Sequence, residues 1–252
     1  QDVRRGRRTH DEGLGRRLVD DPRAGRARRG AERPGGADRR CRLRHTRHLR
    51  WPRRHTHLQP HRRDGITYNR FHVTAVCSPT RAALLTGRNQ HRVGVGSIAE
   101  YPGPFPGYTA AKPKSCAGFP RILRDNGYVT GGFGKWHLTP DNVQGAAGPF
   151  DHWPKSWGFD HWWGFLSGAA GQYDPIITLD DSIVGVPTND DGSQYYFPDD
   201  ITDKAVEWLH AVRAQDAQKP WMMFYSTGCS HAPHHVANVW ADKYKGQFDD
   251  GW

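Results

Sequence analysis

Residues 77–88 read CSPTRAALLTGR, and this run narrows what the chain can fold into more than any other segment. Ser78 is a residue type that caps helix N-termini, and Pro79 suits the first helical position, where a missing N–H costs nothing. The stretch 82–85 continues the helix, and Gly87 can end it in the left-handed conformation. The sequence therefore predicts a helix whose positive amino end lies beside the Cys77 thiol.

Cys77 and Arg81 together predict an anion-binding site. Free backbone N–H groups at a helix N-terminus attract anions, and Arg81 adds a planar set of donors one turn further along. A buried structural cysteine beside an ordinary capped helix is the alternative, because burial is the usual fate of a single cysteine.

Residues 1–64 differ sharply in composition from the rest of the chain. They hold 21 Arg and no Lys against 8 acidic residues, a net charge of +13, whereas residues 65–252 carry a net charge of −3. The segment shows no helical or strand periodicity, and it has too little apolar surface to offset the entropy of ordering. A disordered basic tail, a nucleic-acid-binding arm and a GC-rich gene read in the wrong frame are the three hypotheses. Aromatic residues do not alternate with its arginines, apart from Trp51, and this counts against nucleic acid as a partner.

The wrong-frame hypothesis is favoured by the absence from residues 1–64 of Lys, Ile, Phe, Tyr, Asn and Met, whose codons are AT-rich. Shifting synonymous codons for residues 31–63 by one base permits the sequence RNVLVVLTDDAGFG, a buried strand followed by an aspartate pair and a Gly-rich turn. The pair would be written across the codons of Arg39, Arg40 and Cys41. We therefore expect residues 1–64 to be disordered or out of frame and the protein proper to occupy 65–252.

Other features of the chain bound its environment. No apolar run is long enough to span a bilayer, and no signal-peptide pattern is visible, so we expect a cytoplasmic protein with no membrane partner. The cysteines lack metal-type CxxC spacing and need no disulfide framework; they are Cys41, Cys77, Cys116 and Cys229.

The pattern of helices and strands predicts an α/β fold with a mostly parallel central sheet and helices on both faces. A helix at 119–126, ended by Gly127, precedes a strand at 128–130. A second helix at 202–215, capped by Thr202, precedes an apolar run at 221–226 that suits a strand buried on both faces. A helix followed by a strand, occurring twice, is typical of a parallel sheet between helices. The apolar face predicted for the second helix consists of Ala205, Val206, Leu209 and Val212.

Less regular structure is expected between these pairs. The Gly-, Trp- and Pro-rich residues 145–175 predict an irregular excursion whose aromatic side chains mostly pack under a long loop. Residues 176–186 could hold one or two strands.

Polar residues follow both predicted strands. Lys135 and His137 are two apart and project to the same side if the backbone there is extended. The second strand is followed by His231, His234 and His235, which could suggest zinc, although no matching cysteine or carboxylate spacing accompanies them. In parallel sheets such residues gather past the carboxyl ends of the strands.

These segments together resemble the sulfatase family. Cys-x-Pro-x-Arg followed by Leu-x-Thr-Gly-Arg is similar to the family signature, and Gly-Lys-Trp-His at 134–137 to a second family segment. His-Ala-Pro-His at 231–234 and Gly-Phe-Asp…Gly-Phe at 158–165 are similar to two more. The resemblance covers about 65–252 and implies an incomplete alkaline-phosphatase-like fold, the middle of a longer enzyme.

The resemblance also implies a reaction, the hydrolysis of small-molecule sulfate monoesters of the arylsulfatase type. Cys77 would be converted by a formylglycine-generating enzyme, and its hydrated formylglycine would bind a divalent cation, usually Ca²⁺, and attack sulfur. Arg81 would hold the hydrate, Lys135 and His231 would bind sulfate oxygens, and His137 would take the proton whose loss expels sulfate. A phosphonate or phosphate monoester hydrolase of the same superfamily is the alternative.

Two departures from the family concern the metal. Its acidic ligands are not present in this chain in a suitable motif, because Asp20 and Asp21 lie too far from Cys77 and follow no strand. A later family segment with an Asp-Asn pair and a lysine does not appear before Trp252. We therefore expect the 252-residue chain to be inactive or unfolded alone.

Overall fold

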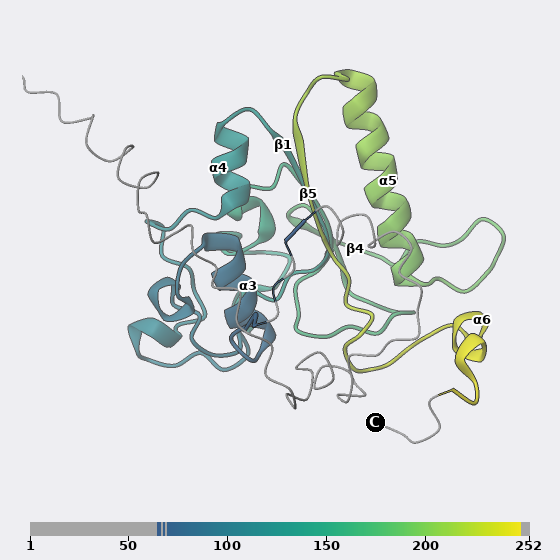
Figure 1. Ribbon diagram of the computed structural model, residues 1–252, viewed down its shortest axis with the longest axis horizontal. Coiled ribbons are helices and arrows are strands. Elements are labelled where there is room, and N and C mark those ends of the chain that lie inside the picture. The colour runs from purple at the N-terminus through teal and green to yellow at the C-terminus, as the bar shows by residue number, and fades with distance from the viewer. Residues whose placement is uncertain (1–64, 67, 69, 248–252) are drawn as a thin grey trace, which may run out of the picture. The chain divides into compact units, whose positions relative to one another are not determined.

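The computed structural model describes residues 65, 66, 68 and 70–247, so the expectations for residues 1–64 lie outside the described part of the chain. Figure 1 shows the arrangement of the elements. In chain order they are α3 (Cys77–Thr86), α4 (Phe119–Asp125), β1 (Val129–Lys135), β2 (His161–Phe165), β3 (Ile177–Leu179), β4 (Ser182–Val184), α5 (Phe197–Gln215), β5 (Trp221–Ser226) and α6 (Asn238–Ala241).

The five strands form one sheet in the order β4-β3-β2-β1-β5. β1 runs parallel to both of its neighbours, with Phe133 opposite Trp163 of β2 and Tyr225 of β5. The hairpin β3–β4 adds two antiparallel pairings at the other edge. The predicted α/β fold is confirmed, with a parallel centre in a mixed sheet.

Helices cover both faces of this sheet. On one face Trp162 and Phe224 pack with Ala82 and Leu85 of α3. On the other face Trp163 belongs to a second core cluster, which packs on α5. Adjacent residues of a strand point to opposite faces, which is why neighbouring tryptophans belong to different cores. Figure 1 accordingly shows α4 and α5 on opposite sides of β1 and β5.

The longest helix begins earlier than the sequence predicts. α5 starts at Phe197, and Thr202 lies inside it, where its Oγ1 donates to Pro198 O at 2.8 Å. The predicted cap at Thr202 is wrong because Phe197 and Ile201, both fully buried, draw the first turn of the helix onto the sheet. Of the predicted apolar face, Ala205 and Val212 are buried, Leu209 is half-buried and Val206 is exposed.

β5 is less buried than expected. Trp221 is 38% and Tyr225 45% exposed, so burial on both faces is wrong for this strand. The reason is position, since β5 forms one edge of the sheet in the described part of the chain.

The aromatic run at 157–165 contains a strand that the sequence did not predict. β2 occupies its second half, and Trp157, Phe159 and Trp162 are buried around Trp136 in edge-to-face contacts. The expected aromatic packing is confirmed, but it forms the core rather than a layer under a loop. Of the two possibilities for residues 176–186, the structure has two strands. No helix in the described segments is both long and apolar enough to cross a membrane.

Candidate active site

Cys77 is the first residue of α3. Val76 is the N-cap residue, so the predicted cap at Ser78 and helix start at Pro79 are wrong by two positions. Pro79 is tolerated because the first-turn N–H groups have no partner within the helix. Gly87 ends the helix at φ 64°, as predicted. Cys77 therefore lies within the first turn, beside unpaired backbone N–H groups that favour negative charge.

Ser78 has a different function from the predicted one. Its side chain is fully buried, and its Oγ accepts a hydrogen bond from the Ala99 N–H at 3.1 Å. The start of α3 is thereby joined to a distant loop, which also carries Glu100.

His137 meets Cys77 although the backbone there is not extended. β1 ends at Lys135, and His137 adopts a left-handed φ of 60°, so the predicted extended geometry is wrong. A non-glycine residue rarely adopts this conformation, and such strain is concentrated at functional sites. His137 Nδ1 nevertheless lies 3.0 Å from Cys77 Sγ. The buried Lys135 ammonium interacts electrostatically with Cys77 as well.

Glu100 completes this cluster and was not predicted from the sequence. Both of its carboxylate oxygens lie 2.7 Å from His137 Nε2. Burial raises the pKa of Glu100, but the hydrogen bond from His137 and the nearby positive charges outweigh it, so the pKa lies below its ordinary value. No motif marks this residue, because its position depends on how a loop folds back onto α3.

Arg81 joins the carboxyl ends of two strands. Its Nη1 donates to the Lys135 carbonyl and to Ser226 Oγ, each at 2.7 Å. Ser226 was also missed, although it is the polar residue that ends an apolar strand run, a position where sites form in such sheets. The guanidinium is thereby held beside Cys77, with which it interacts electrostatically.

Burial sets the protonation of these groups. It lowers the pKa of Arg81 to about 10, which leaves the guanidinium charged at neutral pH. Burial also lowers the pKa of Lys135, against the opposing influence of Cys77. Burial lowers the pKa of His137 more than Glu100 raises it, so the imidazole is neutral near pH 7. The site therefore combines fixed positive charge with an uncharged base.

His231 makes no hydrogen bond or ion pair to Cys77, Lys135 or His137 among the described residues. It is exposed in the loop after β5, where its Nδ1 donates to Ala232 O at 2.7 Å. Contacts therefore join four of the five predicted site residues, and none of these contacts includes His231.

The described residues do not fit a metal ion. Calcium takes about six to eight oxygen ligands. Within residues 65, 66, 68 and 70–247 there is no group of three His, Cys, Asp or Glu side chains that could hold a metal. For the zinc alternative, His235 accepts from the Gln172 N–H and stacks on Tyr173 instead. Cys229 is a free, exposed cysteine.

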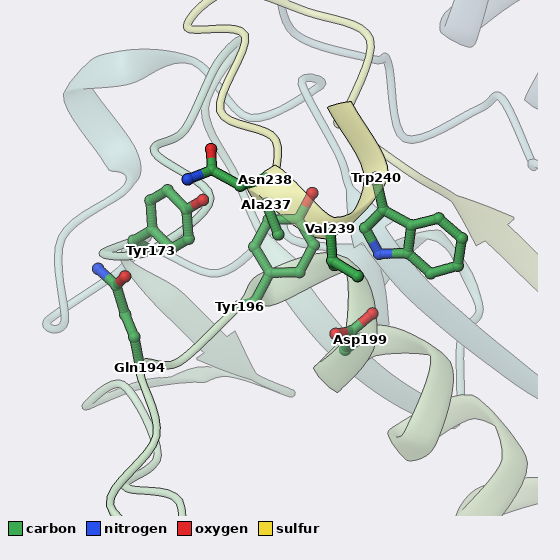
Figure 2. A pocket seen from close by; sticks show the side chains of 8 residues that line it. All are labelled: Tyr173, Gln194, Tyr196, Asp199, Ala237, Asn238, Val239 and Trp240. Atoms are coloured by element: carbon green, nitrogen blue, oxygen red, sulfur yellow. The ribbon is translucent and has the colours of Figure 1, made fainter. Parts of the chain in front are cut away.

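A pocket of about 340 Å³ opens beside the start of α5 (Figure 2). Its wall combines aromatic rings with amide and carboxylate groups, from Tyr173, Tyr196, Trp240, Gln194, Asn238 and Asp199. Two loops connect it to the cluster around Cys77. One passes Gly168, where an added Cβ would lie 2.6 Å from His137 Cε1, and reaches Tyr173. The other loop passes Gly228 and reaches α6. A Cβ added at Gly228 would lie 4.0 Å from Lys135 Cβ.

The sequence profile of the Sulfatase family matches residues 43–252. The chain belongs to the sulfatase family. The match begins inside the Arg-rich segment, earlier than the expected boundary at residue 65. Among curated sulfatases, an N-acetylglucosamine-6-O-sulfatase of Bacteroides thetaiotaomicron is 32% identical over 182 residues, 69% of this chain and 26% of the relative. An arylsulfatase of Klebsiella aerogenes is 25% identical over 205 residues, 77% of this chain and 42% of the relative.

Solved sulfatase-type structures agree with this assignment. A protein solved in complex with its substrate, D-glucosamine-2-N,6-O-disulfate, superposes with a TM-score of 0.50 at 26% identity. The match covers 71% of this chain and 30% of that one. The sulfatase sequence described here therefore spans less than half the length of the relatives that it matches.

Proposed function

We propose that the intact product of this gene hydrolyses sulfate monoesters at the site around Cys77, as the sulfatase relatives do. The contact of a helix-start cysteine with the neutral imidazole of His137 is the observation that carries the proposal. The buried Lys135 and the half-buried Arg81 add the positive charge that an anionic ester requires.

Residue 77 is proposed to act after conversion to formylglycine, which supplies a hydrated aldehyde with two hydroxyl groups, one to attack sulfur. Lys135 would bind a sulfate oxygen and stabilise charge on the leaving oxygen. Arg81, fixed by two hydrogen bonds, would keep its positive charge beside residue 77. His137 Nδ1 would accept the proton of the second hydroxyl, so that sulfate is expelled and the aldehyde returns. His231 would bind another sulfate oxygen, as the resemblance implies.

No step is assigned to a metal ion, because the described residues do not fit one. The family's divalent cation, expected to be Ca²⁺, and a formylglycine-generating enzyme as partner remain proposals from the resemblance.

The organic part of the ester is proposed to enter the pocket of Figure 2. Two loops lead from the Cys77 cluster to this pocket, and its amide and carboxylate groups suit the hydroxyl groups of a sugar. The named substrates of the hexosamine sulfatase relatives support a sulfated amino sugar as the substrate class.

The assay that tests the proposed function compares an aryl sulfate with the matching aryl phosphate and phosphonate. It uses the 252-residue chain and the intact gene product, with residues 31–64 restored to the other frame and the later family segment present, each co-expressed with a formylglycine-generating enzyme. We expect the restored product to hydrolyse the sulfate fastest, the 252-residue chain to be inactive, and Cys77→Ala to abolish turnover. Faster phosphate or phosphonate hydrolysis supports the alternative reaction, and a restored product without activity contradicts the proposal.

A further inference from the structure

Glu100 and His137 form a pair beside Cys77, in which the imidazole is buried and the carboxylate is partly exposed. The His137 side chain is 1% exposed, and its ring nitrogens face different partners. Nε2 lies 2.7 Å from both Glu100 carboxylate oxygens, while Nδ1 lies 3.0 Å from Cys77 Sγ. The imidazole therefore bridges the carboxylate and the residue proposed as nucleophile.

The chemistry of the carboxylate decides which nitrogen carries the proton. An ionised carboxylate only accepts hydrogen bonds, so Nε2 must donate, and Nδ1 of the neutral ring then presents its lone pair to residue 77. In the other tautomer a bare Nε2 would face the carboxylate, and the proton on Nδ1 would leave the ring unable to act as a base toward residue 77.

The surroundings hold Glu100 in this place. Ala99, the preceding residue, donates its N–H to the buried Ser78 of α3, so the helix that begins with Cys77 also fixes the backbone beside Glu100. Gly168 packs against the pair from the other side. A Cβ at that position would lie 2.5 Å from Glu100 Oε1 and 2.6 Å from His137 Cε1, so only glycine leaves room.

We propose that Glu100 is a positioning residue, which fixes the tautomer and orientation of His137 so that Nδ1 accepts the proton from residue 77. In that step the hydroxyl O–H bond breaks, its electron pair stays on oxygen, and the proton binds Nδ1 while Nε2 keeps its own. The Glu100 carboxylate then offsets the charge of the imidazolium. The inference rests on the proposed function for the source of the proton. Which ring nitrogen of His137 is protonated can nevertheless be measured without turnover.

Nitrogen-15 NMR of the full chain labelled at histidine tests the proposal, because long-range proton–nitrogen correlations distinguish protonated from bare ring nitrogens. Loss of one signal set in His137→Asn assigns the ring. We expect a protonated Nε2, a bare Nδ1, and an Nε2 proton shifted far downfield by its hydrogen bond to a carboxylate. A proton on Nδ1 in the unsubstituted chain overturns the proposal without the need for any variant at Glu100.

Two variants test whether Glu100 is the cause. Glu100→Gln keeps the shape but offers an amide that accepts or donates, and Glu100→Ala removes the acceptor. We expect the Nε2 proton to move upfield and exchange at least about tenfold faster with solvent, or the tautomers to mix. Glu207→Gln, which removes an exposed carboxylate of α5 paired with Lys204, is the matched control and leaves the signals unchanged. Unchanged His137 signals in a folded Glu100 variant overturn the proposal.

These results are separable from those for the proposed function. Loss of the tautomer signature contradicts the role of Glu100 even where sulfate is hydrolysed. A bare Nδ1 that depends on Glu100 supports it even where hydrolysis is absent.

Discussion

The Arg81 guanidinium donates to the Lys135 carbonyl at 2.7 Å, at the point where β1 ends. The same Nη1 donates to Ser226 Oγ at the end of β5. One side chain from α3 thus holds the carboxyl ends of two parallel strands and keeps its charge beside Cys77. The structural role of Arg81 and its proposed role beside residue 77 thus depend on the same two hydrogen bonds.

Substitution of Arg81 by lysine is expected to loosen this junction. A lysine keeps the charge but loses the planar set of donors, so one buried acceptor remains unsatisfied. Hydrogen bonds to charged groups contribute about 1.5–3 kcal/mol, and we expect the free energy of unfolding to fall by about 1–3 kcal/mol. Urea denaturation measures the change. Arg213→Lys on the exposed surface of α5 is the control. An equally small effect of both substitutions would show that Arg81 does not stabilise the fold by joining the ends of β1 and β5.

Gly168→Ala is expected to separate Glu100 from His137. The added methyl group would lie 2.5 Å from Glu100 Oε1 and 2.6 Å from His137 Cε1, so one side chain must move. We expect the downfield Nε2 proton of His137 to be lost from the NMR spectrum. Gly185→Ala, where an added Cβ meets nothing within 4 Å, provides the control. Identical His137 signals in both variants would show that the contact is not tight.

Trp136 is expected to contribute most to the core between the sheet and α3. It is fully buried and makes edge-to-face contacts with Trp157, Phe159 and Trp162. Removal of a large buried aromatic side chain costs about 3–5 kcal/mol, so Trp136→Ala should lower the free energy of unfolding by that amount or prevent folding. Tyr101→Ala, at a side chain 75% exposed, should change it by about 0.5 kcal/mol or less. Comparable losses in the two variants would be inconsistent with this core.

Trp240→Ala is expected to weaken binding of a sulfated amino sugar. Trp240 is half exposed at the wall of the pocket, so the substitution removes contact area without opening the core. A loss of about 1.4 kcal/mol corresponds to a tenfold higher dissociation constant. Isothermal titration calorimetry with glucosamine 6-sulfate measures it. Trp221→Ala, at the amino end of β5, is the comparison. Equal affinities of the two variants would show that the sugar does not bind in this pocket.

Much of the fold could be predicted from the sequence, because helix–strand pairs with clear apolar patterns determine α4–β1 and α5–β5. β2 could not be predicted, because its run of aromatic residues lacks the alternation of apolar and polar residues that distinguishes a strand from aromatic packing under a loop. The early start of α5 depends on tertiary burial of Phe197, which local capping rules do not include.

The site was predictable where residues belong to motifs. Cys77, Arg81, Lys135 and His137 come together as expected, whereas Glu100 and Ser226 depend on the folding of a loop and on the register of β5. His231 makes no hydrogen bond or ion pair to these residues in the described part of the chain, and its ring donates to the adjacent Ala232 carbonyl.

The nucleotide sequence of codons 31–64 should show a one-base shift that restores an aspartate pair across codons 39–41. The Arg-rich composition and the absence of residue types with AT-rich codons are the basis for this prediction. DNA sequencing of the source gene decides it. Codons that give no aspartate pair in either shifted frame would favour a true basic segment.

Mass spectrometry of the peptide that contains Cys77, after co-expression with a formylglycine-generating enzyme, tests the central claim most directly. Cys77 begins a helix and lies 3.0 Å from His137 Nδ1, as expected for the modified residue of a sulfatase. We predict an aldehyde at Cys77, with Cys116 and Cys229 unchanged as thiols. An unmodified Cys77 thiol, under conditions that convert a co-expressed sulfatase of known activity, would contradict the account.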